Sequence, residues 1–265
     1  MKRIISVSRR TDIPAFYGDW FMQRLADGFA GYVNPFGGQK YLVALKPENV
    51  VAFVFWSKNF EPFIPDLRAI HDLGYRFYFN YTITGLPDIF ECNLVETEIA
   101  VKALKELSRM YSPGHINWRY DPFVVSDITD YDYHRKRFRE LARMLEGHTE
   151  RCNISFAKQY GKVQRNFDKF RKQTGIAVHD PPIVDRLELA TELAQIASQH
   201  GIRMMSCCSD YLIGGGIEKA HCVDGEVIEE LFHPAGFLHK RKPTRKECGC
   251  TESTDIGAYD TCPHG

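Results

Sequence analysis

The stretch VVAFVFW, residues 50–56, is the longest uninterrupted apolar run in the chain. Its seven residues are too few to span a bilayer, but they fit one β-strand that is buried on both faces. Strands of that kind are typical of parallel sheets, because helices cover both faces of such sheets. The run therefore predicts a parallel α/β fold.

Segments of strand and helix character alternate on both sides of this run. Further strands are predicted at RIISVS (3–8), KYLVAL (40–45), YRFYFNYTI (75–83), INWRY (116–120), CNISF (152–156) and IRMMSC (202–207). Helical spacing recurs between the strands, as in Ala100, Ala103, Leu104 and Leu107, and glycines such as Gly28 end the predicted helices. About six strand–helix units therefore follow one another, which predicts parallel strands joined by helical crossovers.

The length of 265 residues suits one large domain. Six units favour an α/β fold of the open kind, a partial (β/α)6 TIM-like barrel with parallel strands. A closed eight-stranded barrel and a flat doubly wound sheet are the alternatives. Beyond residue 206 the chain becomes rich in glycine, histidine and cysteine. We therefore predict a barrel domain over 1–206 and a cysteine-rich C-terminal extension over 207–265.

Charge and composition restrict the location and the partners. Thirty-four Lys and Arg balance 34 Asp and Glu, so the chain has no global field to hold nucleic acid. The first residues, MKRIISVSRR, lack the apolar core of a signal peptide. We expect a cytoplasmic protein without membrane attachment, and the sequence does not indicate an oligomeric state. The basic residues within 240–246 are interpreted as a solvated loop.

Polar side chains follow the predicted strands, at the edge where ligands bind in parallel α/β sheets. The candidate catalytic residues are Arg9, Arg10, Asp12, Lys58, Arg119 and Asp121, the candidate cofactor-binding residues are Asn80 and Thr82, and Ser155 and Lys158 follow the fifth core strand. Arginine and lysine suit a carboxylate or phosphate, which predicts a small anionic substrate. The aspartates could hold those cations or transfer protons. Alternatively, Asp12 caps a helix and Arg119 forms a structural ion pair with Asp121.

Six of the eight cysteines lie in the last quarter of the chain, at Cys207, Cys208, Cys222, Cys248, Cys250 and Cys262. Disulfides explain this clustering poorly in a reducing cytosol. Thiolates at close spacing select zinc or iron–sulfur clusters. Cys207 or Cys208, together with Cys222, Cys248 and Cys250, supplies the four ligands that either metal centre needs.

The final stretch, CGCTESTDIGAYDTCPHG (248–265), resembles the C-terminal signature of an uncharacterised bacterial family, a domain of unknown function. The likeness extends to SVSRRTDIPAF, FVFWSKN, WRYDPFV and CCSDYLIGGGIEKAHCVD, so it covers nearly the whole chain. In that family CPHG continues into C-x-x-C-Y-A. The completed C-x3-C-x2-C string is similar to the cluster-binding stretch of spore photoproduct lyase and related radical S-adenosylmethionine proteins. There it precedes the barrel, whereas here it follows the barrel, as in a circular permutation.

This resemblance implies a radical S-adenosylmethionine enzyme with a [4Fe–4S] cluster, whose first ligand matches Cys262. Such a cluster reduces S-adenosylmethionine to release a 5′-deoxyadenosyl radical. The resemblance also implies that the chain ends inside the cluster motif and that Cys262 lies near the carboxyl ends of the strands.

Two other hypotheses stay open. One is a barrel with a structural zinc bound by Cys207, Cys222, Cys248 and Cys250 and a non-radical or binding function. The other is a nucleic-acid repair protein, which rests on the likeness alone and which the neutral net charge argues against.

Overall fold

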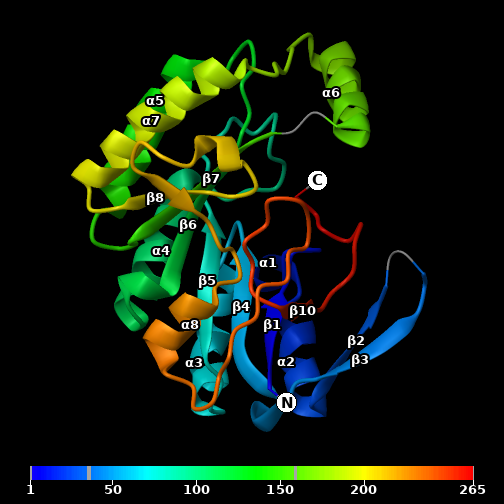
Figure 1. Ribbon diagram of the computed structural model, residues 1–265. Helices are drawn as coiled ribbons and strands as arrows, with labels where there is room; N and C mark the ends of the chain where they lie inside the picture. The colour runs from blue at the N-terminus through cyan, green and yellow to red at the C-terminus, as the bar shows by residue number, and fades with distance from the viewer. Residues whose placement is uncertain (1, 35–36, 158–159, 265) are drawn as a thin grey trace.

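The sheet at the centre of the fold is parallel and open (Figure 1). The computed structural model describes residues 2–34, 37–157 and 160–264, and within these ranges eight strands form one sheet. In spatial order they are β10 (Ser253–Asp255), β1 (Arg3–Val7), β4 (Val50–Ser57), β5 (Phe77–Thr82), β6 (Ile116–Phe123), β7 (Arg151–Phe156), β8 (Arg203–Ser206) and β9 (Ile217–Lys219). Each neighbouring pair is parallel, which confirms the predicted α/β fold. Lys158 lies outside the described residues.

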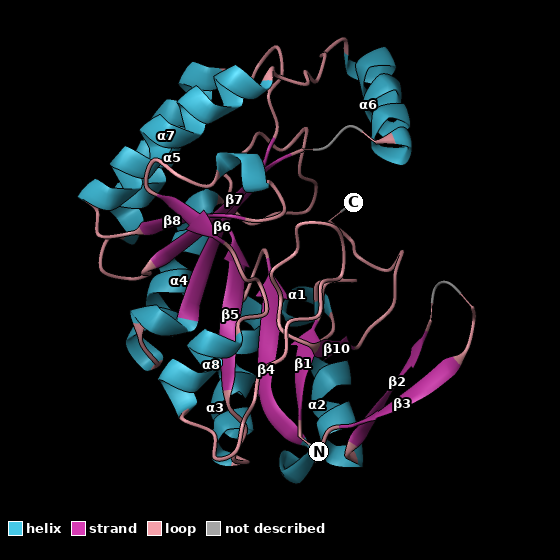
Figure 2. Ribbon diagram, viewed as in Figure 1, coloured by secondary structure: helices cyan, strands magenta, loops and turns pink. Residues whose placement is uncertain are grey.

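Helices connect most of these strands, and an antiparallel hairpin follows the first two helices along the chain (Figure 2). The helices are α1 (Ile13–Phe16), α2 (Gly18–Asp27), α3 (Ile64–Asp72), α4 (Thr97–Met110), α5 (Tyr131–Leu145), α6 (Gly161–Thr174), α7 (Ile183–Gln199) and α8 (Gly225–Phe232), and the hairpin pairs β2 (Phe29–Val33) with β3 (Lys40–Ala44). Gly28 ends α2 with a φ of 79°, a conformation that glycine adopts without strain. Among the described helices, none has the length and the apolar character needed to cross a membrane.

The strand order distinguishes between the predicted architectures. From β1 through β4 to β9 the strands follow chain order across the sheet, whereas a doubly wound sheet reverses its order partway. The closed eight-stranded barrel is wrong for the described residues, because β9 and β10 form the two edges and do not pair with each other. Both edge strands come from the segment after residue 206. The predicted division into a barrel domain over 1–206 and an extension over 207–265 stays a prediction.

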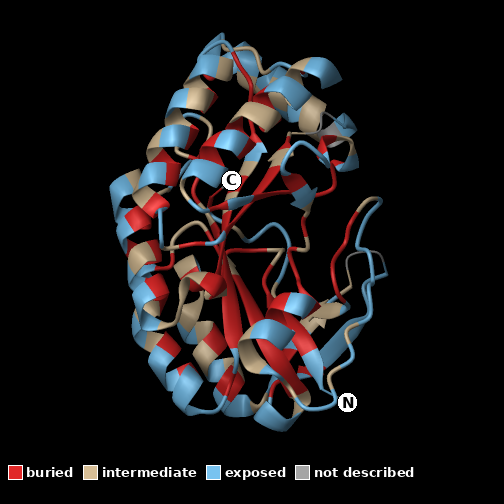
Figure 3. Ribbon diagram, turned by 60° about the vertical axis from the view of Figure 1, so that its left-hand side comes forward, coloured by how far each residue is buried: buried red, intermediate tan, exposed pale blue. Residues whose placement is uncertain are grey.

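The two faces of the sheet differ in chemistry. In β6, Ile116, Trp118 and Tyr120 pack into the large apolar core beneath the crossover helices, and this core is the buried centre of Figure 3. The alternating residues Asn117 and Arg119 face the other side. β6 also runs three residues past its predicted end at Tyr120, so Asp121 lies within the strand together with Arg119. We refer to this second, partly polar side as the inner face.

The segment after residue 206 covers the inner face. Val227 and Ile228 of α8 pack with Val54 and Tyr78 in a second apolar cluster. The carbonyl oxygen of Cys222 accepts hydrogen bonds from Tyr78 Oη (3.0 Å) and Asn80 Nδ2 (2.9 Å). The extension is therefore part of the folded core.

His134 predicts how stability depends on pH. The side chain is fully buried on α5, with Nδ1 3.0 Å from Tyr120 Oη and Nε2 3.0 Å from the Val124 carbonyl. Burial lowers the pKa of His134 from 6.5 to about 4. Between these two values the unfolded chain binds more protons, so stability is complete above pH 6.5 and is lost as the pH falls toward 4.

We expect His134→Gln to reduce the loss of unfolding free energy over this pH window by about 3 kcal/mol. Urea denaturation at several pH values measures the loss. The exposed His71, changed to Gln, serves as the control and should leave the profile unchanged. Superimposable profiles for His134→Gln and the parent chain would contradict the assignment.

Candidate functional site

A cavity of about 660 Å³ lies at the carboxyl ends of the strands, and we call it the strand-end cavity. Every candidate catalytic, cofactor-binding and metal-binding residue proposed from the sequence lines it, with the exception of Asn80, whereas the strand-end residue Ser155 does not. The candidates that line it are Arg9, Arg10, Asp12, Lys58, Thr82, Arg119, Asp121, Cys207, Cys208, Cys222, Cys248, Cys250 and Cys262. The fold thus brings the strand-end charges and the late cysteines together in one space.

Asn80 is placed elsewhere. Its side chain is fully buried on the inner face of β5 and bonds the Cys222 carbonyl. The sequence assigned it to cofactor binding because it ends an apolar strand. Strand periodicity explains the difference, since Asn80 lies two residues before Thr82, on the same face but deeper along the strand.

Three of the candidate cations are already neutralised by carboxylates. Arg9 Nε lies 2.9 Å from Asp255 Oδ2 and thereby joins β1 to β10. Lys58 pairs with Glu91, a carboxylate that the sequence analysis missed. Arg119 pairs with Asp121, as the structural alternative predicted, while both residues also line the cavity. These ion pairs lower the free-energy cost of removing the charged groups from water.

Arg10 differs from these three. Among the described residues no carboxylate lies within ion-pair distance of it, and its guanidinium carbon lies 4.8 Å from the Tyr32 ring and 5.2 Å from the Tyr259 ring. Its Nη1 donates to the carbonyl of Gly257 at 3.3 Å. Its Nε, like the neighbouring Thr11 Oγ1, is buried without a hydrogen-bond partner in the described part of the chain. Arg10 and Thr11 therefore keep bonding capacity for a ligand.

Asp12 connects three segments at one side of the cavity. Its Oδ1 accepts a hydrogen bond from Ala15 N at 3.0 Å, which caps α1 as the sequence alternative predicted. Its Oδ2 accepts from Lys58 N at 2.8 Å and lies 3.0 Å from His264 Nε2. The end of β1, the end of β4 and the C-terminal tail therefore meet at one carboxylate.

The tail that carries Cys262 is held on both sides of this cysteine. Tyr17 Oη donates to the Thr261 carbonyl at 2.5 Å, and Asn93 Nδ2 donates to the Pro263 carbonyl at 2.8 Å. His264 is 8% exposed, and its Nδ1 has no partner among the described residues. The sequence contained no signal for this histidine beyond its position in CPHG.

The other five cavity cysteines form a ring that we call the thiol cluster: Cys207, Cys208, Cys222, Cys248 and Cys250. Cys207 Sγ lies 3.3 Å from Cys222 Sγ and 3.9 Å from Cys208 Sγ. Cys248 hydrogen-bonds Cys208 and Cys250, and Cys250 hydrogen-bonds Cys222, which closes the ring. No member is more than 9% exposed.

Two guanidinium groups donate into the thiol cluster. Arg119 Nη1 lies 3.0 Å from Cys222 Sγ, and Arg245 Nε lies 3.0 Å from Cys208 Sγ. Arg245 belongs to the basic run that the sequence analysis interpreted as a solvated loop. That interpretation is wrong for this residue, because its guanidinium faces the thiols although the residue as a whole is exposed.

The thiols differ in acidity according to their place in the ring. Hydrogen bonds from Cys207 and Cys250 lower the pKa of Cys222 well below its ordinary value, and Arg119 adds to this effect. The bonds of Cys207 to Cys208 and Cys222 raise the pKa of Cys207. Around the ring, the pKa is lowered for Cys222 and Cys248 and raised for Cys207, Cys208 and Cys250. As they stand, no three His, Cys, Asp or Glu side chains in the described ranges have the arrangement of a metal-ion site.

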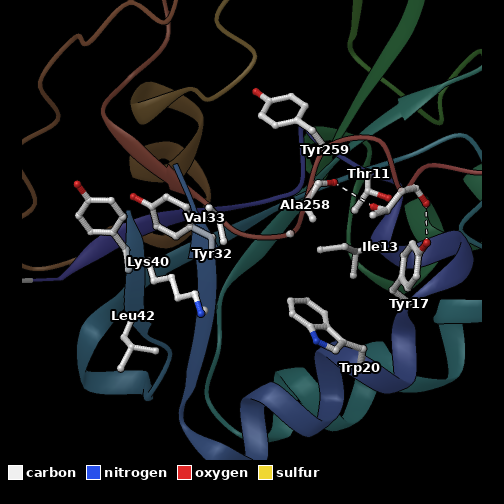
Figure 4. Close-up of a pocket in the computed structure, with 14 residues that line it drawn as sticks. Thr11, Ile13, Tyr17, Trp20, Tyr32, Val33, Lys40, Leu42, Ala258 and Tyr259 are labelled. Atoms are coloured by element: carbon white, nitrogen blue, oxygen red, sulfur yellow. Dashed lines mark hydrogen bonds between the residues drawn. The ribbon is translucent and has the colours of Figure 1, made fainter. Parts of the chain in front are cut away.

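An apolar pocket of about 660 Å³, the aromatic pocket, adjoins the strand-end cavity (Figure 4). The close-up shows Tyr32 and Leu42 of the β2–β3 hairpin on one side and Trp20 of α2 on the other. Thr11 and Tyr259 line both spaces. A ligand in the strand-end cavity could therefore place an apolar part among these side chains.

Comparison with known proteins identified one family. The family model described as "Domain of unknown function (DUF1848)" matches residues 4–265. A search of curated proteins found no match to the chain.

The position of Asp12 predicts an effect on the tail. Asp12→Ala removes an N-cap acceptor and the partner of His264, so we expect the unfolding free energy to fall by about 2 kcal/mol. We also expect faster amide hydrogen exchange across residues 258–264. The exposed Asp88, changed to Ala, is the matched control. Unchanged exchange in the tail would show that other contacts hold it.

Proposed function

The chain belongs to the DUF1848 family, and we propose that it is an iron–sulfur enzyme of the radical S-adenosylmethionine type that acts on an anionic substrate. The observation that carries the proposal is the content of the strand-end cavity. Cys262, the candidate first cluster ligand, and Arg10, a cation without a carboxylate partner among the described residues, line the same space.

The residues of this chain fit one ligand position of the cluster. Cys262 is partly buried, faces the cavity and is fixed by the contacts of Thr261 and His264. The other two thiolates of the C-x3-C-x2-C pattern would follow Gly265. When bound, such a cluster supplies the electron that cleaves the sulfonium of S-adenosylmethionine. Because one ligand of three is present, we derive no step through the cluster.

Arg10 and Thr11 are the residues that we assign to the substrate or cofactor anion. Their unpartnered Nε and Oγ1 can donate to a carboxylate or phosphate, and the stacked tyrosines hold the guanidinium in place. Lys58 and Arg119 are already paired, so we assign them to shaping the cavity. The aromatic pocket would receive an apolar part of the ligand and exclude water from it.

The finer fold prediction forms part of this proposal. We propose that the open sheet is a partial (β/α)6 barrel whose inner face is covered by the extension at 207–265. Two observations support it: the strands run in chain order from β1 to β8, and the crossover helices α2, α3, α4, α5 and α7 pack into one core.

A cytoplasmic location is proposed on chemical grounds. Eight cysteines are free, and five of them lie in contact without a disulfide. Such thiols persist in a reducing compartment, which also suits an iron–sulfur cluster.

The test uses the chain continued past Gly265 by the two further cysteines of the pattern. It is purified without oxygen and reconstituted with iron and sulfide. We expect the spectrum of the reduced cluster to change when S-adenosylmethionine is added. Cys262→Ala should lower the iron content by about four ions per chain and abolish this response.

Cys92→Ala provides the matched control, because Cys92 is exposed and does not line the strand-end cavity. It should keep both the iron and the spectral response. If Cys262→Ala behaves like Cys92→Ala, Cys262 is not a cluster ligand and the proposal fails.

A second candidate substrate class is nucleic acid, which a basic groove beside the cavity favours. This groove, of about 1280 Å³, shares Arg9 and Arg10 with the strand-end cavity. Its basic residues are Lys2, Arg3, Arg9, Arg10, Arg76, Lys240 and Lys242, against the acidic Glu252 and Asp255. A local excess of positive charge can hold phosphates although the whole chain is neutral.

Fluorescence anisotropy with a labelled single-stranded oligonucleotide tests this candidate. The double variant Arg76→Ser with Lys240→Ser should weaken binding and make the slope of log Kd against log salt shallower by about 2. The exposed Lys102 and Lys172, changed to Ser together, are the control. Equal slopes for the two double variants would assign the groove to another role.

A further inference from the structure

We infer that the thiol cluster is a zinc site, in which four of the five cysteines bind one ion that links the two edges of the open sheet. This site is separate from the iron–sulfur centre proposed at Cys262. Its ligands lie entirely within the described residues, so the inference does not depend on the proposed function.

The spacing of the sulfurs fits a single ion. Four thiolates about 2.3 Å from zinc lie about 3.8 Å from one another in a tetrahedron. The Cys207–Cys208 separation is 3.9 Å, and the Cys207–Cys222 separation is 3.3 Å. A four-iron cluster places a cube of iron and sulfide between its thiolates and holds them farther apart.

Small side-chain rotations are needed to load the ion. The thiols contact one another around a ring, and as they stand no three of these described side chains have the arrangement of a metal site. The contact between Cys207 and Cys222 is about 0.5 Å shorter than the edge of a zinc–thiolate tetrahedron. Rotation about the Cα–Cβ bonds separates neighbouring sulfurs and opens room for the ion.

The surroundings match the charge of a zinc tetrathiolate. Four thiolates and one Zn²⁺ carry a net charge of about −2. Arg119 and Arg245 each donate to a sulfur at 3.0 Å. Arg119 also pairs with Asp121, so part of its charge is used there. Guanidinium donors at thiolates lower the cost of burying an anionic centre.

The backbone around the ligands is arranged for metal-bound thiolates. Val223 N lies 3.5 Å from Cys250 Sγ, and Cys250 N lies 3.5 Å from Cys248 Sγ. Such donors orient first-shell ligands and stabilise their charge. Gly249 permits the tight C-x-C turn, since a Cβ there would lie 3.0 Å from the ring of His221.

The consequence for the fold is a second link between the two edges of the sheet, beside the hydrogen bond that Thr251 N donates to the Val223 carbonyl at 2.8 Å. Cys207 and Cys208 follow β8, near one edge of the sheet, while Cys248 and Cys250 precede β10 at the other edge. Cys222 lies in the segment between β9 and α8. One ion would therefore tie both edges together across the inner face.

A disulfide is the competing use of the same thiols. It would join two sulfurs, such as those of Cys207 and Cys222, and leave three buried thiols around two arginines without an assigned role. A four-coordinate ion uses the thiols and the guanidinium groups together. We therefore assign the thiol cluster to a zinc ion rather than to a disulfide.

The test is the metal content of the 265-residue chain, purified under reducing conditions after expression with zinc. Mass spectrometry of the native protein and elemental analysis should give one zinc per chain. We expect Cys222→Ser with Cys250→Ser to lower the zinc content at least tenfold. The controls Cys92→Ser and Cys262→Ser should keep it, and the second of these separates this site from the proposed iron–sulfur centre.

Cobalt substitution of the unmodified chain covers the case in which the double variant does not fold. Co²⁺ should give the intense thiolate charge-transfer and tetrahedral ligand-field bands of a four-sulfur site. Absence of zinc, full zinc retention in a folded double variant, or a cobalt spectrum without thiolate bands would each overturn the inference. A chain that is two mass units lighter and metal-free would assign the thiols to a disulfide, and iron with sulfide at these cysteines would assign them to a cluster.

Discussion

The hydrogen bonds to the Cys222 carbonyl are the contact on which the rest of this structure depends. The inner face of the sheet carries buried polar side chains, and each costs about 1–3 kcal/mol if it is left unpaired. Tyr78 and Asn80 satisfy theirs on Cys222 O, and Arg119 reaches the sulfur of the same residue. An amphipathic helix would offer this face mostly apolar side chains. A looping segment offers backbone carbonyls and thiols, so irregular chain around Cys222 covers the polar part of the inner face, while α8 covers an apolar part.

This cover also explains how an open sheet can have stable edges. The edge strands β9 and β10 span three residues each, which leaves little exposed backbone for another chain to pair with. Contacts outside the ladder add to their pairing. Asp255 of β10 forms an ion pair with Arg9, and the chain that leaves β9 is held at the Cys222 carbonyl by Tyr78 and Asn80. The strand-end cavity lies between these two attachments and is lined by residues from both.

The sequence predicted the parts of the fold that local periodicity determines. Each predicted strand overlaps an observed one, and observed helices end within two residues of Gly28, Gly74, Gly147 and Gly201, because an apolar stripe and a glycine stop are local signals. The strand-end residues could be found because parallel strands present their carboxyl ends at one edge. β9 and β10 could not be found, since three residues carry no periodicity and their pairing is long-range. α6 was missed although Val163, Phe167 and Phe170 have helical spacing, because the rest of the segment is polar or glycine and, of its described side chains, none is buried. His264 and Arg245 became visible only when the tail was placed against β1 and the thiols.

The two proposed metal sites, at the thiol cluster and at Cys262, line one cavity but require different chemistry. Zinc has a filled d shell and does not change its oxidation state, so it can hold a frame beside a radical reaction without accepting the electron. An iron–sulfur cluster at the thiol ring would be a second electron acceptor within the same cavity as Cys262. The thiol cluster is buried and receives hydrogen bonds from two arginines and backbone amides, whereas Cys262 is less buried and lines the same cavity as Arg10 and Thr11, which each have a donor that is unpartnered among the described residues. A closed tetrahedron is the usual form of a structural zinc site, and an open position is what a reacting centre requires. The geometry therefore separates a closed site that holds the extension on the sheet from an open one where a ligand can bind.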